Sequence, residues 1–104
     1  MNIGIYSRVF KEEHTPYVLE LIQQLTQFNF SFFMFESYYK SIKNKLDKQK
    51  ISTFKTADDV KRNINLLISL GGDGTLLDTL HLVQDSEIPV AGINMGRLGF
   101  LADI

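Results

Sequence analysis

The sequence contains no cysteine among its 104 residues. Disulfide bonds and zinc sites built from thiolates are therefore excluded. It also lacks an excess of one charge, because 11 basic and 12 acidic residues give a formal charge of −1. A protein without a basic surplus has no global attraction for nucleic acid or for an anionic membrane. We therefore expect neither nucleic acid nor a membrane as a partner.

Long hydrophobic runs are missing as well. No apolar stretch approaches the about 20 residues that a membrane-spanning helix needs, and Met1 to Tyr6 lacks the features of a secretory signal. We expect a cytoplasmic protein. What is present is an ordinary globular composition, 44% hydrophobic and 22% charged, in a chain long enough for one domain with a modest core.

Short apolar runs alternate with segments of helical periodicity along the chain. This alternation predicts an α/β fold with an open, mostly parallel, doubly wound sheet and helices on both faces. The expected strands are 3–6, 30–35, 51–54, 66–70 and 90–93, and the expected helices begin near residues 15, 38, 57 and 75.

Two of the helices carry more detailed predictions. Thr15 precedes Pro16 and is expected to be the N-cap of its helix, with Pro16 at the first helical position. The helix after residue 75 is expected to bury one apolar stripe, formed by Leu76, Leu77, Leu80 and Val83. The polar segment between Arg8 and His14 is expected to be a loop.

A glycine-rich segment, Gly71-Gly72-Asp73-Gly74-Thr75, follows the predicted strand 66–70 and precedes a predicted helix. Glycines let the backbone turn tightly and approach a phosphate, and a helix N-terminus presents unpaired N–H groups to an anion. The segment matches neither the P-loop nor the dinucleotide-binding fingerprint. By itself it indicates an anion site and no more.

Asp73 is an unexpected residue in such a loop, because a carboxylate repels phosphate unless it binds a cation or a proton. It suits a general base that activates an attacking hydroxyl, or a contact to magnesium. It also suits a simple turn residue or the N-cap of the following helix. The segment alone leaves these alternatives open.

A second motif follows the last predicted strand, at Asn94-Met95-Gly96-Arg97-Leu98-Gly99-Phe100-Leu101. Together with Gly71 to Leu77, this motif resembles the NAD kinase family. The glycine motif is shared with lipid kinases and 6-phosphofructokinases, whereas the second motif is similar to NAD kinases and not to the lipid kinases. The resemblance is strong over residues 66–104 and implies a domain like the N-terminal one of the phosphofructokinases.

The resemblance implies a reaction and a set of site residues. NAD kinases transfer phosphate from ATP to the 2′-hydroxyl of the adenosine ribose of NAD, with a divalent metal such as Mg²⁺, and they are commonly dimers or tetramers. By resemblance, Asp73 is the catalytic base, and the ligand-binding residues are Gly72, Asp73, Gly74, Thr75 and Phe100. No residue is assigned to the metal. Phe100 also fits a core position, and Asn94 fits either the glycine turn or the ligand.

The chain also departs from the family pattern. Many members carry a basic residue five positions after the catalytic aspartate, where this chain has Asp78, and only His81 lies nearby in sequence. Residues 1–104 correspond to the N-terminal domain alone, so the β-rich C-terminal NAD-binding domain is expected outside them. We therefore expect a fragment that is inactive in isolation. The alternatives are a lipid (diacylglycerol-type) kinase domain, a non-catalytic nucleotide-binding module and a flavodoxin-like domain.

Overall fold

The computed structural model of the chain describes residues 1–46 and 50–94, except for the side chain of Asp73. These residues form one five-stranded parallel sheet with the order β3-β2-β1-β4-β5. The strands are β1 Asn2–Tyr6, β2 Ser31–Phe35, β3 Ile51–Phe54, β4 Leu66–Leu70 and β5 Val90–Ile93. The predicted parallel α/β fold is confirmed, and all five predicted strands are present.

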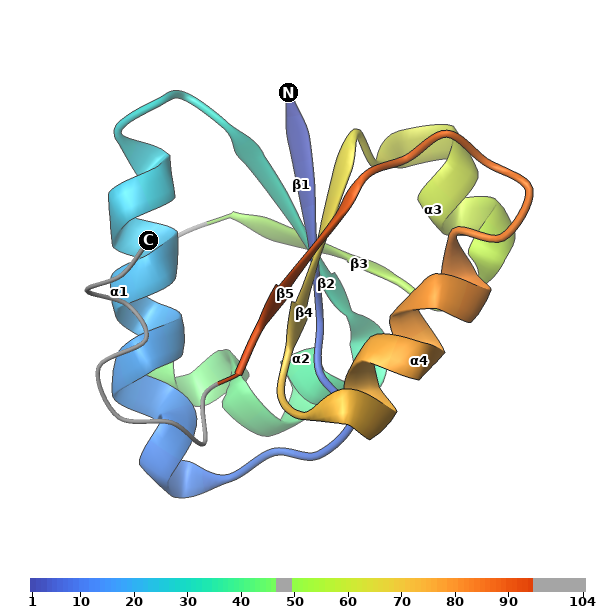
Figure 1. Ribbon diagram of the computed structural model, residues 1–104. Coiled ribbons are helices and arrows are strands. Elements are labelled where there is room, and N and C mark those ends of the chain that lie inside the picture. Colours follow the sequence, from blue (N-terminus) through green and yellow to red (C-terminus); the bar gives the residue numbers. More distant parts are fainter. Residues whose placement is uncertain (47–49, 95–104) are drawn as a thin grey trace.

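Helices connect the strands and cover both faces of the sheet (Figure 1). They are α1 Thr15–Thr26, α2 Glu36–Ile42, α3 Ala57–Asn63 and α4 Asp73–Leu82, with short 3₁₀ turns at Glu12–His14 and Lys43–Lys45. In the described residues, no helix has the length and apolar character that crossing a membrane requires.

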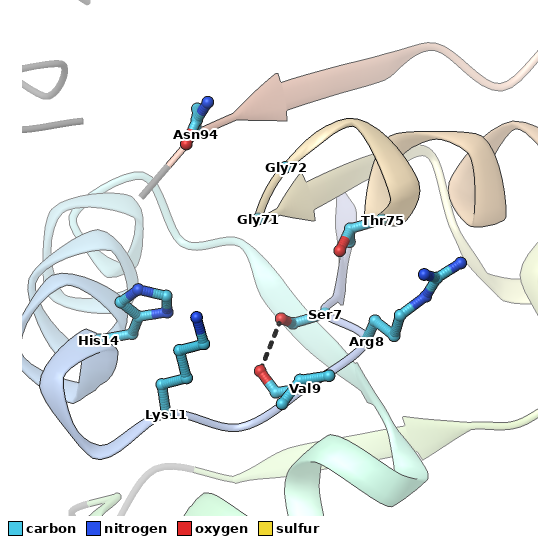
Figure 2. Close-up of a pocket in the computed structure, with 9 residues that line it drawn as sticks. All are labelled: Ser7, Arg8, Val9, Lys11, His14, Gly71, Gly72, Thr75 and Asn94. Atoms are coloured by element: carbon cyan, nitrogen blue, oxygen red, sulfur yellow. Dashed lines mark hydrogen bonds between the residues drawn. The ribbon is translucent and has the colours of Figure 1, made fainter. Parts of the chain in front are cut away.

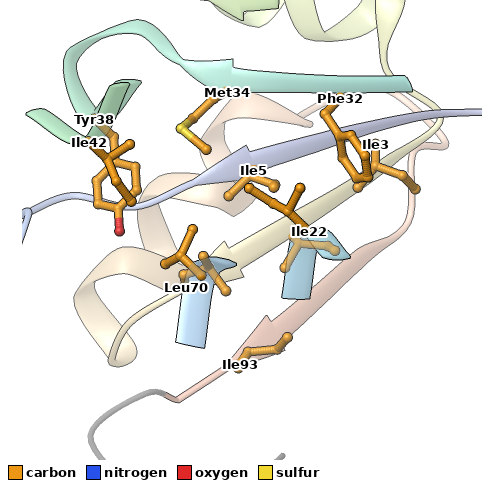
Figure 3. Close-up of a cluster of buried hydrophobic side chains, with 11 residues drawn as sticks. Ile3, Ile5, Ile22, Phe32, Met34, Tyr38, Ile42, Leu70 and Ile93 are labelled. Carbon is orange, nitrogen blue, oxygen red and sulfur yellow. The ribbon is translucent and has the colours of Figure 1, made fainter. Parts of the chain in front are cut away.

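One face of the sheet packs against α1 and α2 (Figure 3). Successive side chains of a strand point to opposite faces, so Ile3 and Ile5 of β1 lie together on this side. They meet Val18 and Ile22 of α1, and all four side chains are almost fully buried. The rest of this cluster consists of Phe32, Met34, Tyr38, Ile42, Ile68, Leu70 and Ile93. This face supplies the larger part of the core.

The opposite face packs against α3 and α4. Its cluster is formed by Tyr6, Phe54, Val60, Ile64, Leu67 and Val83. The alternation within β1 and β4 therefore assigns each side chain to one of two cores, as expected for parallel strands covered on both sides.

Two helix predictions need correction. His14, not Thr15, is the N-cap of α1, and no side chain makes a capping hydrogen bond there. Thr15 is the first helical residue, and its Oγ1 is buried without a partner in the described residues. The 3₁₀ turn of residues 12–14 leads directly into α1, so the chain is already helical when it reaches Thr15. The helix predicted to begin near residue 38 instead begins at Glu36 and ends at Ile42.

The predicted stripe of α4 is only partly right: Val83 is buried and Leu76 half-buried, but the two other leucines are not. Leu77 and Leu80 are exposed, with 59% and 49% of their surface accessible, whereas Thr75 and Thr79 are buried. Threonine can be buried on a helix because its hydroxyl bonds back to a carbonyl of the preceding turn. Thr79 Oγ1 does so, donating to the carbonyl oxygen of Thr75 at 2.9 Å.

Strand order determines where loops can form a site. From β1 the chain proceeds to β2 and β3 on one side, whereas β4 proceeds to β5 on the other. The loops after β1 and β4 therefore diverge at the carboxyl ends of two neighbouring strands. Such a reversal point is where doubly wound sheets bind their ligands.

Candidate functional site

A pocket of about 320 Å³ opens at this reversal point (Figure 2). The loop after β1 and the turn after β4 form its walls, and Asn94 at the end of β5 contributes as well. Its described lining residues are Ser7, Arg8, Val9, Lys11, His14, Gly71, Gly72, Thr75 and Asn94. A second pocket of about 140 Å³ lies between the same glycine turn and β5. The glycine turn thus separates two cavities.

Gly71 makes the turn possible. Its φ of +148° lies in a region that L-residues rarely adopt. A Cβ at this position would lie 2.7 Å from Thr75 Oγ1, closer than real Cβ atoms approach other atoms. The Gly71 N–H donates to the carbonyl oxygen of Ile93 at 2.9 Å. The turn is therefore held against β5, and Gly71 is required by geometry.

Helix α4 begins immediately after this turn. Gly72 is its N-cap and has no side chain that could accept a hydrogen bond, and the first intrahelical bond runs from Leu76 N–H to the Gly72 carbonyl at 3.1 Å. The N–H groups of residues 73–75 precede that bond, so helix geometry gives them no intrahelical acceptor. Donors of this kind, at the positive end of a helix dipole, suit an anionic ligand.

Asp73 is the first residue of α4. The alternative in which Asp73 caps the helix is therefore wrong, because the N-cap is Gly72. The side chain of Asp73 and the whole of Phe100 lie outside the described residues, as does the motif from Met95 onward. Their assigned roles remain predictions.

Of the other predicted ligand-binding residues, Gly72 and Thr75 line the pocket. Gly74 lies beside it, where a Cβ would come within 2.9 Å of Arg8 Nη1. Asn94 lines both cavities. The structure thus brings Gly72, Thr75 and Asn94 together, as the sequence motifs suggest.

Arg8 is the residue that the sequence did not single out. Its Nε and Nη2 donate to Asp78 Oδ2 and Oδ1, each at 2.8 Å, and the hydroxyl of Tyr6 donates to Asp78 Oδ2 at 2.9 Å. The Arg8 and Tyr6 hydrogen bonds lower the pKa of the Asp78 carboxyl from 3.8 to about 2. Burial, together with the bond to Asp78, raises the pKa of Tyr6 to about 12. Asp78 is therefore ionised and Tyr6 neutral near pH 7.

Lys11 and His14 lie on the other side of the pocket from Arg8 (Figure 2). The sequence predicts only a polar loop for this segment and does not single out either residue. They reach the pocket because the loop after β1 passes below the glycine turn before α1 begins. Among the described lining residues, the fixed charges are the cations of Arg8 and Lys11, and Asp78 offsets that of Arg8 from outside the lining. Lys11 and the backbone donors of α4 therefore favour an anion.

The described residues contain no group of three or more His, Cys, Asp or Glu side chains arranged to hold a metal. Both oxygens of Asp78 already accept hydrogen bonds from Arg8 and Tyr6. Magnesium commonly enters such sites bound to substrate phosphates, and no residue role below depends on it.

A doubly wound parallel sheet with a glycine-walled pocket at its reversal point is typical of nucleotide-binding α/β domains. Residues 3–104 match the family model described as the ATP-NAD kinase N-terminal domain. The chain belongs to this family.

Individual relatives agree with this assignment. The chain is 35% identical to an NAD kinase of Christiangramia forsetii, covering 100% of this chain and 36% of that protein. It is 39% identical to an NAD kinase of Cytophaga hutchinsonii, over 98% of this chain and 35% of that protein. The chain thus spans about a third of the length of these relatives.

A solved structure of yeast NADH kinase complexed with NADH has the same fold. It superposes with a TM-score of 0.75 at 22% identity, covering 96% of this chain and 31% of that one. This likeness supports the architecture described above.

Proposed function

We propose that this chain is the N-terminal domain of an NAD kinase that transfers the terminal phosphate of ATP to the 2′-hydroxyl of the adenosine ribose of NAD. The observation that carries the proposal is the pocket at the reversal point, walled by the glycine turn and the N-terminus of α4. It combines backbone donors with cations, as phosphoryl transfer requires. Family membership supports the choice of ATP and NAD as the substrates.

In the proposed reaction, the ribose 2′-oxygen attacks the γ-phosphorus of ATP and the bond to the β,γ-bridging oxygen breaks. ADP leaves with that oxygen, and the proton of the 2′-hydroxyl passes to the carboxylate of Asp73. Asp73 follows the glycine turn directly, at the start of α4. The N–H groups of the first turn would stabilise charge on the phosphates.

The proposal extends to the rest of the protein. The curated relatives are about three times as long as this chain, so we propose that a C-terminal domain completes the NAD site and joins the subunits of an oligomer. Phe100 would lie beside the adenine, and Mg²⁺ would accompany ATP. A cytoplasmic location is part of the same proposal. None of the relatives named above is a lipid kinase, and no described residue favours that alternative.

The test compares the 104-residue chain with the whole protein that contains it. Each is incubated with ATP, magnesium and NAD, and NADP is quantified with an NADP-specific dehydrogenase. We expect NADP from the whole protein and none above background from the 104 residues. NADP production by the short chain would contradict the need for a second domain.

Asp73→Asn in the whole protein tests the base. We expect turnover to fall by about 100-fold or more, with thermal stability unchanged. Near-normal turnover would remove Asp73 from the mechanism. If the unsubstituted protein binds nucleotide but forms no NADP, the chain belongs to a non-catalytic module.

A further inference from the structure

The Arg8–Asp78–Tyr6 group connects two sides of the pocket and has no role in the reaction as described above. Arg8 lies in the loop after β1, and Asp78 lies one turn beyond Thr75 on α4. Two bonds of 2.8 Å fix the guanidinium, and the Tyr6 hydroxyl fixes the carboxylate. Figure 2 shows the Arg8 side chain extending from the loop toward the first turns of α4.

We infer that Arg8 binds the phosphate chain of the nucleotide in the pocket, and that Asp78 and Tyr6 are the residues that position it. This inference rests on the proposed function and adds to it a phosphate-binding cation from the loop after β1. The ligand chemistry is an oligophosphate, which both ATP and NAD contain.

The number of donors on Arg8 supports this role. A guanidinium has five N–H donors, and Asp78 accepts two of them. Three donors therefore remain for other acceptors. Nη1, which Asp78 does not use, lies next to Gly74, since a Cβ built on Gly74 would be 2.9 Å from it. Gly74 belongs to the first turn of α4, where the backbone donors lie.

The absence of a side chain at Gly74 is part of the same arrangement. Any larger residue would displace the guanidinium from the helix. With glycine, the guanidinium lies against the first turn of α4, the turn that carries the N–H groups of residues 73–75. A planar guanidinium held by a carboxylate is well suited to bind a phosphate, because little orientational entropy remains to be lost.

Stability alone is a weak explanation for the pair. The Arg8 side chain is 54% exposed, and exposed ion pairs contribute little to folding. Two hydrogen bonds from Arg8 to Asp78, with a third from Tyr6, hold the guanidinium more firmly than anchoring the loop after β1 would require. A structural role and a ligand role also predict different measurements.

The test measures binding of ATP, NAD and inorganic triphosphate, separately and without turnover, to the whole protein that contains this chain, by titration calorimetry. We expect Arg8→Ala to weaken binding of triphosphate and of at least one nucleotide by about 10- to 100-fold. The affinity of the Arg8→Ala variant for triphosphate should also depend less on salt concentration. The nucleotide that loses affinity identifies whose phosphates Arg8 contacts.

The matched control is Arg62→Ala. Arg62 lies near the end of α3, which leads into the start of β4. It is therefore near the amino ends of the strands, whereas the pocket lies at their carboxyl ends. We expect the Arg62→Ala variant to bind ATP, NAD and triphosphate with affinities within twofold of those of the unsubstituted protein. If Arg8→Ala binds all three ligands as Arg62→Ala does, the inference is wrong. Arg8→Gln replaces Arg8→Ala if the alanine variant does not fold.

A double-mutant cycle tests the positioning role of Asp78. If Asp78 orients Arg8, Arg8→Ala should reduce the affinity for triphosphate by less than about threefold when Asp78→Asn is already present. An equal loss in both backgrounds would overturn the positioning role. These readouts do not need NADP formation. A protein that requires Arg8 to bind ATP but makes no NADP would refute the proposed function and leave this inference intact.

Discussion

Gly71 and Gly72 are adjacent in the turn after β4, but the structure makes different demands on them. Gly71 has a positive φ and a nearby Thr75 hydroxyl, so both its backbone conformation and its surroundings exclude a side chain. A Cβ at Gly72 would have nothing within 4 Å, and its φ of −100° suits any residue. The first glycine is thus needed by the fold, whereas the second leaves open space toward the ligand.

This difference predicts opposite phenotypes. Gly71→Ala should lower the free energy of unfolding by about 1–3 kcal/mol, because alanine is strained at that φ. Gly72→Ala should leave the free energy of unfolding unchanged within about 0.5 kcal/mol and instead weaken ATP binding. Urea denaturation and calorimetry measure the two quantities. Equal destabilisation by both substitutions would contradict the geometry described for the turn.

The site residues differ in how far the sequence could reveal them. Gly72 and Thr75 belong to a contiguous motif that encodes its own turn and helix start, so they could be predicted. Arg8 could not, because its partner Asp78 is 70 residues away in sequence and only the pairing of β1 with β4 brings the two together. Its neighbours in sequence carry no pattern that distinguishes it from an exposed loop arginine.

Among the elements, α4 shows where pattern reasoning failed. Apolar residues at helical spacing predicted the buried face, yet two of the leucines are exposed, and Thr75 and Thr79 are buried along with Val83. The turn at Gly71 and Gly72 fixes how the helix is rotated about its axis, and Thr75 must face the turn because it packs over Gly71. A local requirement of the turn therefore outweighed the transfer free energy of two leucines. Strand positions were easier, because short apolar runs bounded by polar residues allow few alternatives.

Helix α3 offers a clean test at this scale. Thr56 is its N-cap and forms a capping box, in which Thr56 Oγ1 accepts from the Asp59 N–H at 3.2 Å and Asp59 Oδ2 accepts from the Thr56 N–H at 3.2 Å. We expect Thr56→Ala to destabilise the protein by about 1 kcal/mol, measured by thermal or urea denaturation. Thr56→Ser retains the hydroxyl and is the control. If both variants lose the same stability, the box is not the cause.

At the scale of the whole molecule, the Arg8–Asp78 pair links the loop after β1 to α4 and makes the link sensitive to pH. The Arg8 hydrogen bond, followed by that of Tyr6, lowers the pKa of Asp78 to about 2 in the folded chain, against 3.8 ordinarily. The unfolded chain therefore takes up this proton at a higher pH than the folded chain does. The stabilisation from this pair is complete above about pH 5 and is lost as the pH falls toward 2.

We therefore expect the difference in free energy of unfolding between the unsubstituted protein and Asp78→Asn to be constant from about pH 5 to 7 and to narrow toward pH 2. Urea titrations at several pH values measure it. Arg8→Ala should show the same narrowing, because the Asp78 carboxyl then loses its main partner. A difference that stays constant down to pH 2 would show that Asp78 is not held as described.

The position of β1 at the centre of the sheet also has a consequence for how the chain folds. β1 is synthesised before the other four strands of this sheet, and one of its two neighbours is β4. The contact from Asn2 N–H to Asn65 Oδ1, just before β4, spans 63 residues. Closing so long a loop carries an entropic cost before any contact repays it. While the ribosome is still adding the residues of β4, β1 can pair only with β2, and its other edge stays open. The ligand pocket, which needs both edges, is thus among the last features of this domain to form.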